Sequence, residues 1–175
     1  MKNSFLWQLG GLTFTAILGT LLHFLYGWTG CLALTPISAV NESTWEHMKI
    51  LFFPMLFFAI LQYFIFGKNT DGFWWIQLLS ISLGTLLVPV LFYTLNGVFG
   101  KTPDWLNILL FFVCAGVAYY LAYTLLQTPP SIRVSPILPI LALSLFAVLF
   151  IVFTYAPPKI PLFQDPLYRA YGIVK

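Results

Sequence analysis

A short polar block, Asn41 to His47, lies between long apolar stretches of the chain. It holds Glu42 and Glu46, two of the five acidic residues, and His47, one of the two histidines. Carboxylate and imidazole groups transfer protons near neutral pH and ligate divalent cations such as zinc. In a chain of which only 7% is charged, this concentration indicates a binding or catalytic site.

The second histidine, His23, belongs to a stripe of small residues spaced four apart, which comprises Gly11, Thr15, Gly19 and Gly27. Small side chains let a neighbouring helix approach closely, so we expect His23 to point into the protein, near the polar block. A histidine that only hydrogen-bonds a backbone carbonyl is the alternative. The candidate metal ligands are therefore His23, Glu42, Glu46 and His47, with Asn41 as a further pocket residue.

The elements that must position these residues are membrane helices. The chain is 60% hydrophobic, 19% aromatic and has a mean hydropathy of +0.91, so a water-soluble domain is excluded. A hydrocarbon core about 30 Å thick requires roughly 20 helical residues. Five stretches qualify and predict an all-α integral membrane protein, a bundle of about five transmembrane helices: residues 5–27, 48–66, 73–95, 105–127 and 137–155.

Five spans place the termini on opposite sides of the membrane. One transmembrane domain, residues 1–155, is then followed by a tail, residues 156–175. The segments 28–47 and 96–104 emerge on the same side as this tail, and we name this side the site face. It carries five cations, Lys49, Lys101, Lys159, Arg169 and Lys175, against three on the other side, Lys2, Lys68 and Arg133. This excess favours a cytoplasmic site face.

Two helix starts are predicted on the site face. Ser43 and Glu46 have capping-box spacing, in which the serine hydroxyl accepts from the Glu46 N–H and the Glu46 carboxylate accepts from the Ser43 N–H. In the alternative interpretation, the polar block has no binding or catalytic function and only caps this helix. Before the fourth span, Thr102 is expected to cap and Pro103 to take the first helical position, with Asp104 in the first turn.

Prolines predict a cavity on the same side. Pro54 and Pro89 both lie about 10 Å from the site face, at 1.5 Å per helical residue. Each frees a backbone carbonyl that protein or cavity water must satisfy, although membrane helices often tolerate single prolines. Tyr93, near the end of the third span, is within reach of such a cavity, but interfacial tyrosines are also common.

The tail is too apolar and aromatic to be a solvated linker. We expect it to pack over the site face, where it would offer Asp165 or Arg169 to the cavity. A membrane-surface anchor built from the same aromatic and basic residues is the alternative.

Residues 23–30 read His-Phe-x-Tyr-x-Trp-x-Gly, and residues 36–54 contain Val-Asn-Glu-Ser-x-Trp-Glu-His-x-Lys-x-x-Phe-Phe-Pro. Together with Pro-Leu-Phe-x-Asp-Pro at 161–166, this pattern resembles a family of small bacterial polytopic membrane proteins described only as a domain of unknown function. The resemblance covers most of the chain. It implies a bacterial plasma-membrane protein and carries over no activity.

Three functions remain open. The pocket binds an ion or small polar ligand, as a transporter or as part of a homo-oligomer or larger membrane complex. Alternatively, a Glu and His pair performs acid–base or metal-assisted catalysis at the lipid interface. In the third, the chain is a structural or assembly subunit without a ligand. The net charge of +3 is too small and scattered for nucleic-acid binding.

Overall fold

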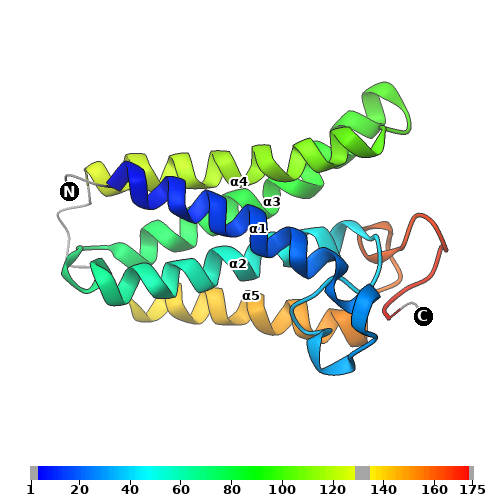
Figure 1. The fold of residues 1–175 in the computed structure, drawn as a ribbon, viewed down its shortest axis with the longest axis horizontal. Coiled ribbons are helices and arrows are strands. Elements are labelled where there is room, and N and C mark those ends of the chain that lie inside the picture. The colour runs from blue at the N-terminus through cyan, green and yellow to red at the C-terminus, as the bar shows by residue number, and fades with distance from the viewer. Residues whose placement is uncertain (1–3, 129–134, 174–175) are drawn as a thin grey trace.

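The computed structural model describes residues 4–128 and 135–173, which form a bundle of long helices (Figure 1). Within this part of the chain there is no β-strand, and five helices are long and apolar enough to cross a membrane. They are α1 (Ser4–Thr29), α2 (Thr44–Ile65), α3 (Phe73–Phe99), α4 (Asp104–Gln127) and α5 (Ile137–Tyr155). The first and last described residues, Ser4 and Ile173, lie at opposite ends of the bundle (Figure 1). The predicted fold class is confirmed.

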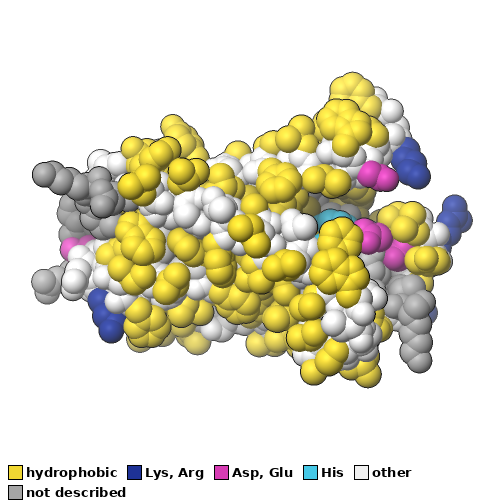
Figure 2. All heavy atoms as spheres, viewed as in Figure 1, with side chains coloured by type: hydrophobic (Ala, Val, Ile, Leu, Met, Phe, Trp, Pro, Cys, Tyr) yellow, Lys and Arg dark blue, Asp and Glu magenta, His cyan; other side chains and the backbone are white. Residues whose placement is uncertain are grey.

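Helix α2 forms the centre of the bundle. In its most apolar window 61% of the residues are buried, whereas the corresponding fraction is 22–33% in the other four helices. Figure 2 shows that apolar side chains cover most of the long surface, while charged groups gather at its two ends. This distribution is that of a bundle whose flanks contact lipid and whose ends contact water.

Small residues bring the helices close together, as the stripe on α1 predicts. A Cβ atom added to Gly11 would overlap the Tyr119 ring and would lie 2.6 Å from the Phe58 ring. One turn later, the Thr15 hydroxyl lies 2.8 Å from the Tyr119 hydroxyl, with which it forms a buried hydrogen bond. Gly27 is an exception, because nothing lies within 4 Å of its added Cβ. The stripe therefore packs only over its inner part.

The predicted cap of α2 is half correct. Ser43 is the N-cap, and its hydroxyl accepts from the Glu46 N–H at 3.4 Å. The prediction of the reciprocal bond is wrong, because the Ser43 N–H donates to Asn41 Oδ1 at 2.8 Å and not to the Glu46 carboxylate. The Glu46 carboxylate instead accepts from the Val40 N–H and pairs with Lys49. The buried ammonium of Lys49 attracts this carboxylate more strongly than a neutral N–H does.

The predicted start of α4 is also corrected. Pro103 has an extended conformation, with φ −69° and ψ 153°, so it precedes the helix and Asp104 is the first helical residue. Thr102 does not cap α4. Its backbone N–H and its hydroxyl lie 3.0 Å and 3.2 Å from the Asn96 side-chain oxygen, at the end of α3. This contact ties together the two ends of the connection between α3 and α4.

The tail folds back onto the end of the bundle where α1 ends and α2 begins (Figure 1). The Trp45 ring lies between Phe150 and Phe163, with ring centroids 4.6 Å and 4.7 Å away. The Asn41 side-chain amide donates to the Gly172 carbonyl at 2.7 Å. Phe163 and Tyr171 of the tail thus pack against the core on the site face, whereas Tyr168 is 71% exposed.

The cytoplasmic orientation of the site face stays a prediction. Of the cations on which it depends, Lys2, Arg133 and Lys175 lie outside the described residues.

Candidate metal centre

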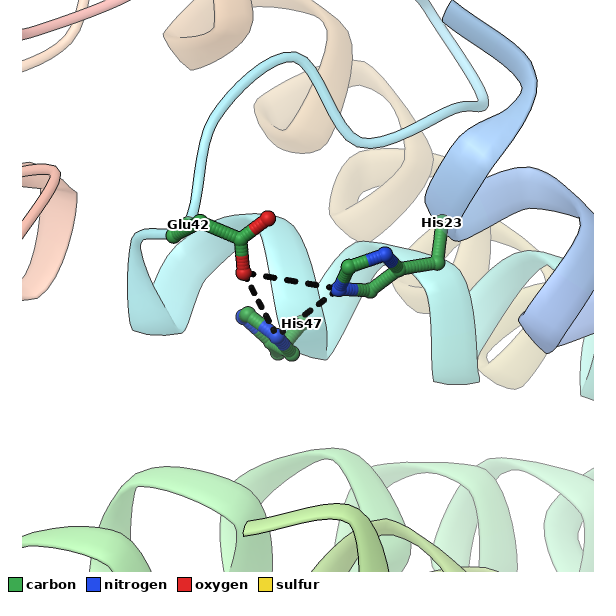
Figure 3. Close-up of side chains that lie close together, drawn as sticks. All are labelled: His23, Glu42 and His47. Carbon is green, nitrogen blue, oxygen red and sulfur yellow. Dashed lines mark hydrogen bonds and ion pairs between the residues drawn. The ribbon is translucent and has the colours of Figure 1, made fainter. Parts of the chain in front are cut away.

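Three of the predicted ligands come together on the site face (Figure 3). His23 comes from the second half of α1, Glu42 from the segment before α2, and His47 from the first turn of α2. The two histidine Nε2 atoms are 3.3 Å apart. One carboxylate oxygen of Glu42 lies 3.5 Å from the His23 Nε2 and 3.7 Å from the His47 Nε2. We call these three residues the His–Glu–His cluster.

The backbone between α1 and α2 holds the cluster in place. The Ala39 N–H donates to the Leu22 carbonyl at 3.1 Å, which ties the connecting segment to α1 beside His23. The Glu42 N–H donates to the Asp165 carboxylate at 3.0 Å, so the tail fixes the backbone of one candidate ligand. The cap at Ser43 then starts α2 in the register that directs His47 toward His23.

The hydrogen bonds of His47 define which ring nitrogen is available. Its Nδ1 lies 2.9 Å from the Ser43 backbone carbonyl oxygen. A carbonyl oxygen can only accept, so Nδ1 carries the proton and Nε2 presents a lone pair to the cluster. Metal-binding histidines are commonly oriented in this way by a hydrogen bond from the other nitrogen.

Glu42 is suited to a ligand role by its charge. The hydrogen bond with His23 lowers the pKa of the Glu42 carboxyl below its ordinary value, and electrostatic interactions with the two neighbouring imidazoles act in the same direction. Partial burial opposes them but does not reverse the shift. Glu42 is therefore ionised at neutral pH, as a metal-binding carboxylate must be.

The spacing of the three atoms matches a metal site. Two ligand atoms bound tetrahedrally to zinc at about 2.0–2.1 Å lie about 3.3–3.4 Å apart. The three separations in the cluster, 3.3, 3.5 and 3.7 Å, exceed this by at most a few tenths of an ångström. The side chains are 22%, 41% and 30% exposed for His23, Glu42 and His47, so an ion has access. One ion could contact all three without movement of the backbone.

A cavity of about 760 Å³ opens beside the cluster, between α1, α2, the facing ends of α3 and α4, and the tail. Figure 2 shows histidine at the surface in a hollow near the site face, with acidic side chains on both sides. On the wall opposite the cluster lie Asn96, Thr102 and Asn107. Two apolar residues beside the prolines also line the cavity. Val88 precedes Pro89, and Ile50 carries the backbone carbonyl that Pro54 leaves without its helical partner, so the cavity reaches the depth that the prolines predict.

Glu46, the fourth predicted ligand, does not join the cluster. Its carboxylate lies 2.5 Å from the Lys49 ammonium, and the two side chains are 2% and 0% exposed. Lys49 also donates to the Thr35 carbonyl at 3.0 Å and to the Thr154 hydroxyl at 2.8 Å. Glu46 and Lys49 form a separate buried ion pair that joins α2 to α5 and to the segment before α2.

Of the remaining predicted pocket residues, two contact the backbone of the site and two lie away from the cavity. Asp165 is buried and accepts from the Glu42, Leu167 and Tyr168 backbone N–H groups. Asn41 bridges the tail and the start of α2. Tyr93 and Arg169 are not among the residues that line the cavity. Asp165 and Asn41 thus hold the backbone around Glu42 without lining the cavity. Tyr93 and Arg169 take no part in the site.

Sequence reasoning missed the polar wall opposite the cluster. Asn107 is a polar residue one turn inside an otherwise apolar span, which is a usable signal for a cavity. Asn96 lies at the end of α3, where an ordinary surface position explains it equally well. Only the fold brings the two together, through Thr102, whose hydroxyl lies 3.0 Å from Asn107 Oδ1.

The fold makes the chain a polytopic α-helical membrane protein. Within that class it belongs to a family of unknown function, DUF6512, because the model of this family matches residues 1–173. This match confirms the resemblance seen in the motifs. No curated protein and no solved structure matches the chain.

Proposed function

We propose that the protein binds one divalent transition metal ion, such as zinc, at His23, Glu42 and His47, and uses it to hold a ligand in the adjoining cavity. We place it in the plasma membrane of a bacterium, with the site face toward the cytoplasm. The observation that carries the proposal is the convergence of three ligand atoms at metal-site spacing.

The ligand types support zinc over calcium or magnesium. Two imidazole nitrogens and one carboxylate oxygen suit zinc and its neighbours, whereas the hard alkaline-earth ions prefer a shell of oxygen atoms. Three protein ligands leave one tetrahedral position free, and the cavity beside the cluster can supply a ligand atom to it. All three protein ligands come from one chain, so metal binding needs neither a homo-oligomer nor a larger complex.

Metal-assisted hydrolysis is a second candidate function. A site of two histidines, one carboxylate and an open position is the arrangement typical of catalytic zinc. Such an ion lowers the pKa of its bound water to about 7 and so generates a nucleophile. This candidate requires the same metal and differs only in whether the bound ligand is converted.

Zinc titration of purified protein tests the proposal. Metal-free protein, its Glu42→Gln variant and its Asp104→Asn variant are titrated with zinc in competition with a chelating dye. The matched control, Asp104, is also an acidic residue of the cavity but lies outside the cluster. We expect about one tightly bound ion in wild type and Asp104→Asn, and at least about tenfold weaker binding in Glu42→Gln. No zinc binding, or equal binding in all three proteins, would refute the proposal.

A further inference from the structure

We infer that the ligand of this cavity is an amphiphile from the bilayer: a single-chain lipid-like molecule whose carboxylate or phosphate head reaches the metal and whose alkyl chain lies along the inner wall. The inference rests on the proposed metal site and names its ligand class. Four features of the cavity carry it.

The first feature is a change of polarity with depth. On α4 the lining changes from Asn107 to Leu110 within one helical turn, and on α3 from Asn96 to Val88 over two turns. The wall that α2 contributes below His47 changes in the same way. A small polar ion or solute would contact only the outer end and leave the apolar inner wall without a partner. A molecule with a polar head and an alkyl chain matches both ends.

The second feature is a lateral opening toward lipid. Phe24 on α1 and Ile108 and Phe112 on α4 line the cavity, yet they are 46%, 60% and 41% exposed. Both helices are membrane spans, so exposed apolar side chains on their flanks face acyl chains rather than water. An amphiphile can therefore move into the cavity from the bilayer without passing its chain through water.

The third feature is a closed inner end. A Cβ atom added to Gly19 would lie 2.6 Å from the Phe111 ring and 3.0 Å from the Ile50 carbonyl oxygen. The Phe111 ring thus packs directly against α1 below the cluster. The cavity volume of about 760 Å³ lies in the range of about 300–1,000 Å³ found for sites that hold whole organic molecules. The site is a pocket with a floor rather than a channel for ions.

The fourth feature is the set of groups that would hold the head. Lys101 and Asp104 both line the cavity and offset one another in charge, so the metal supplies the positive charge that an anionic oxygen requires. The Asn107 carbonyl oxygen faces the Thr102 hydroxyl, while its Nδ2 has no hydrogen-bond partner among the described residues. This amide can donate to a head group in the cavity. Carboxylate and phosphate share the required chemistry, since both offer anionic oxygens to zinc and to N–H donors.

The experiment measures binding of radiolabelled palmitate to zinc-loaded protein in digitonin, a detergent with a rigid steroid body instead of an alkyl chain. Unlabelled palmitate, dodecyl phosphate, acetate and inorganic phosphate serve as competitors. We expect the two alkyl compounds to displace the label and the two bare anions to fail at the same concentration. Their relative potency distinguishes a carboxylate head from a phosphate head. Displacement by inorganic phosphate or acetate as effective as by the alkyl compounds would overturn the inference.

Cavity-filling variants locate the bound chain. Val88→Phe enlarges a buried cavity residue, and Val90→Phe makes the same change at a position of α3 that is 56% exposed. We expect palmitate affinity to fall about tenfold or more only in Val88→Phe. Leu110→Phe, with Leu109→Phe as its control, repeats the comparison on α4 in case Val88→Phe does not fold. Equal affinity within both pairs would overturn the inference.

Zinc content, measured on the same samples, separates the two proposals. Full zinc occupancy without palmitate binding would refute the inference of an amphiphilic ligand and would leave the proposed metal site standing. Palmitate binding without any zinc would refute the metal site instead.

Discussion

Two polar clusters meet at the start of α2 and differ in their burial and in their access to the cavity. In the buried pair, the three protons of Lys49 meet three acceptors, supplied by Glu46, Thr35 and Thr154. The Glu46 carboxylate is likewise contacted by Lys49, Val40 and Thr154. In the His–Glu–His cluster, three ligand atoms face one another beside a cavity. The first cluster is buried and fully paired, which makes it part of the fold, whereas the second is partly exposed beside the cavity, which gives an ion access to it.

Removal of one member of the buried pair should have the largest effect on stability. Glu46→Ala leaves the Lys49 ammonium buried without its counter-ion. We expect a loss of about 3–5 kcal/mol in the free energy of unfolding, because an uncompensated buried charge is strongly destabilising. Denaturation in detergent measures this loss. The control is Glu42→Ala, which removes a 41% exposed carboxylate and should change stability by less than about 1 kcal/mol in metal-free protein.

The double variant Glu46→Leu/Lys49→Met sharpens this test. Replacement of both charges by apolar side chains of similar size removes the unpaired charge, so most of the lost stability should return. Stability as low as that of Glu46→Ala would mean that the individual hydrogen bonds to Val40 and Thr35, rather than charge compensation, hold this region together.

The second prediction concerns the response to zinc. A ligand that binds only the folded state at 100 times its dissociation constant stabilises it by about 2.7 kcal/mol. We expect wild type and Asp104→Asn to show this stabilisation and His47→Ala to lack it. Loss of a ligand should weaken zinc binding by about 100-fold or more, since loss of a supporting hydrogen bond alone costs about 10–100-fold. Thermal unfolding with and without zinc provides the measurement.

The smallest expected effect comes from Ser43→Ala. It removes the N-cap of α2 and should cost about 1 kcal/mol of stability. Zinc affinity should not change, because His47 is oriented by the backbone carbonyl of residue 43, which alanine retains. A parallel fall in zinc affinity would show that the start of α2 and the metal site are coupled, and would contradict this prediction.

The five helices follow from the sequence because each is a long apolar stretch, and the hydrophobic effect together with backbone hydrogen bonding leaves few alternatives in lipid. The position of Glu46 was harder to predict. Adjacent residues on a helix do not face the same way, so Glu46 and His47 cannot both serve one cavity. The Glu46 and Lys49 spacing of three was the available signal for the separation.

The contribution of the tail could be predicted only in part. Its apolar composition indicates that it packs on the protein, and its topology puts it on the site face. The bond between the Glu42 N–H and Asp165 spans 123 residues, and no local pattern encodes a contact at that separation. The same limit applies to the Asn96, Thr102 and Asn107 wall, which exists only because α3 and α4 are held together.

X-ray absorption at the zinc edge reports the type and distance of the atoms that bind the metal. For zinc-loaded wild type, we expect nitrogen and oxygen neighbours at about 2.0–2.1 Å, together with the outer-shell signal of two imidazole rings. His23→Ala should reduce the imidazole signal to one ring. A sulfur neighbour at about 2.3 Å, as the exposed Cys31 would give, or an oxygen shell without imidazole would contradict the His–Glu–His site.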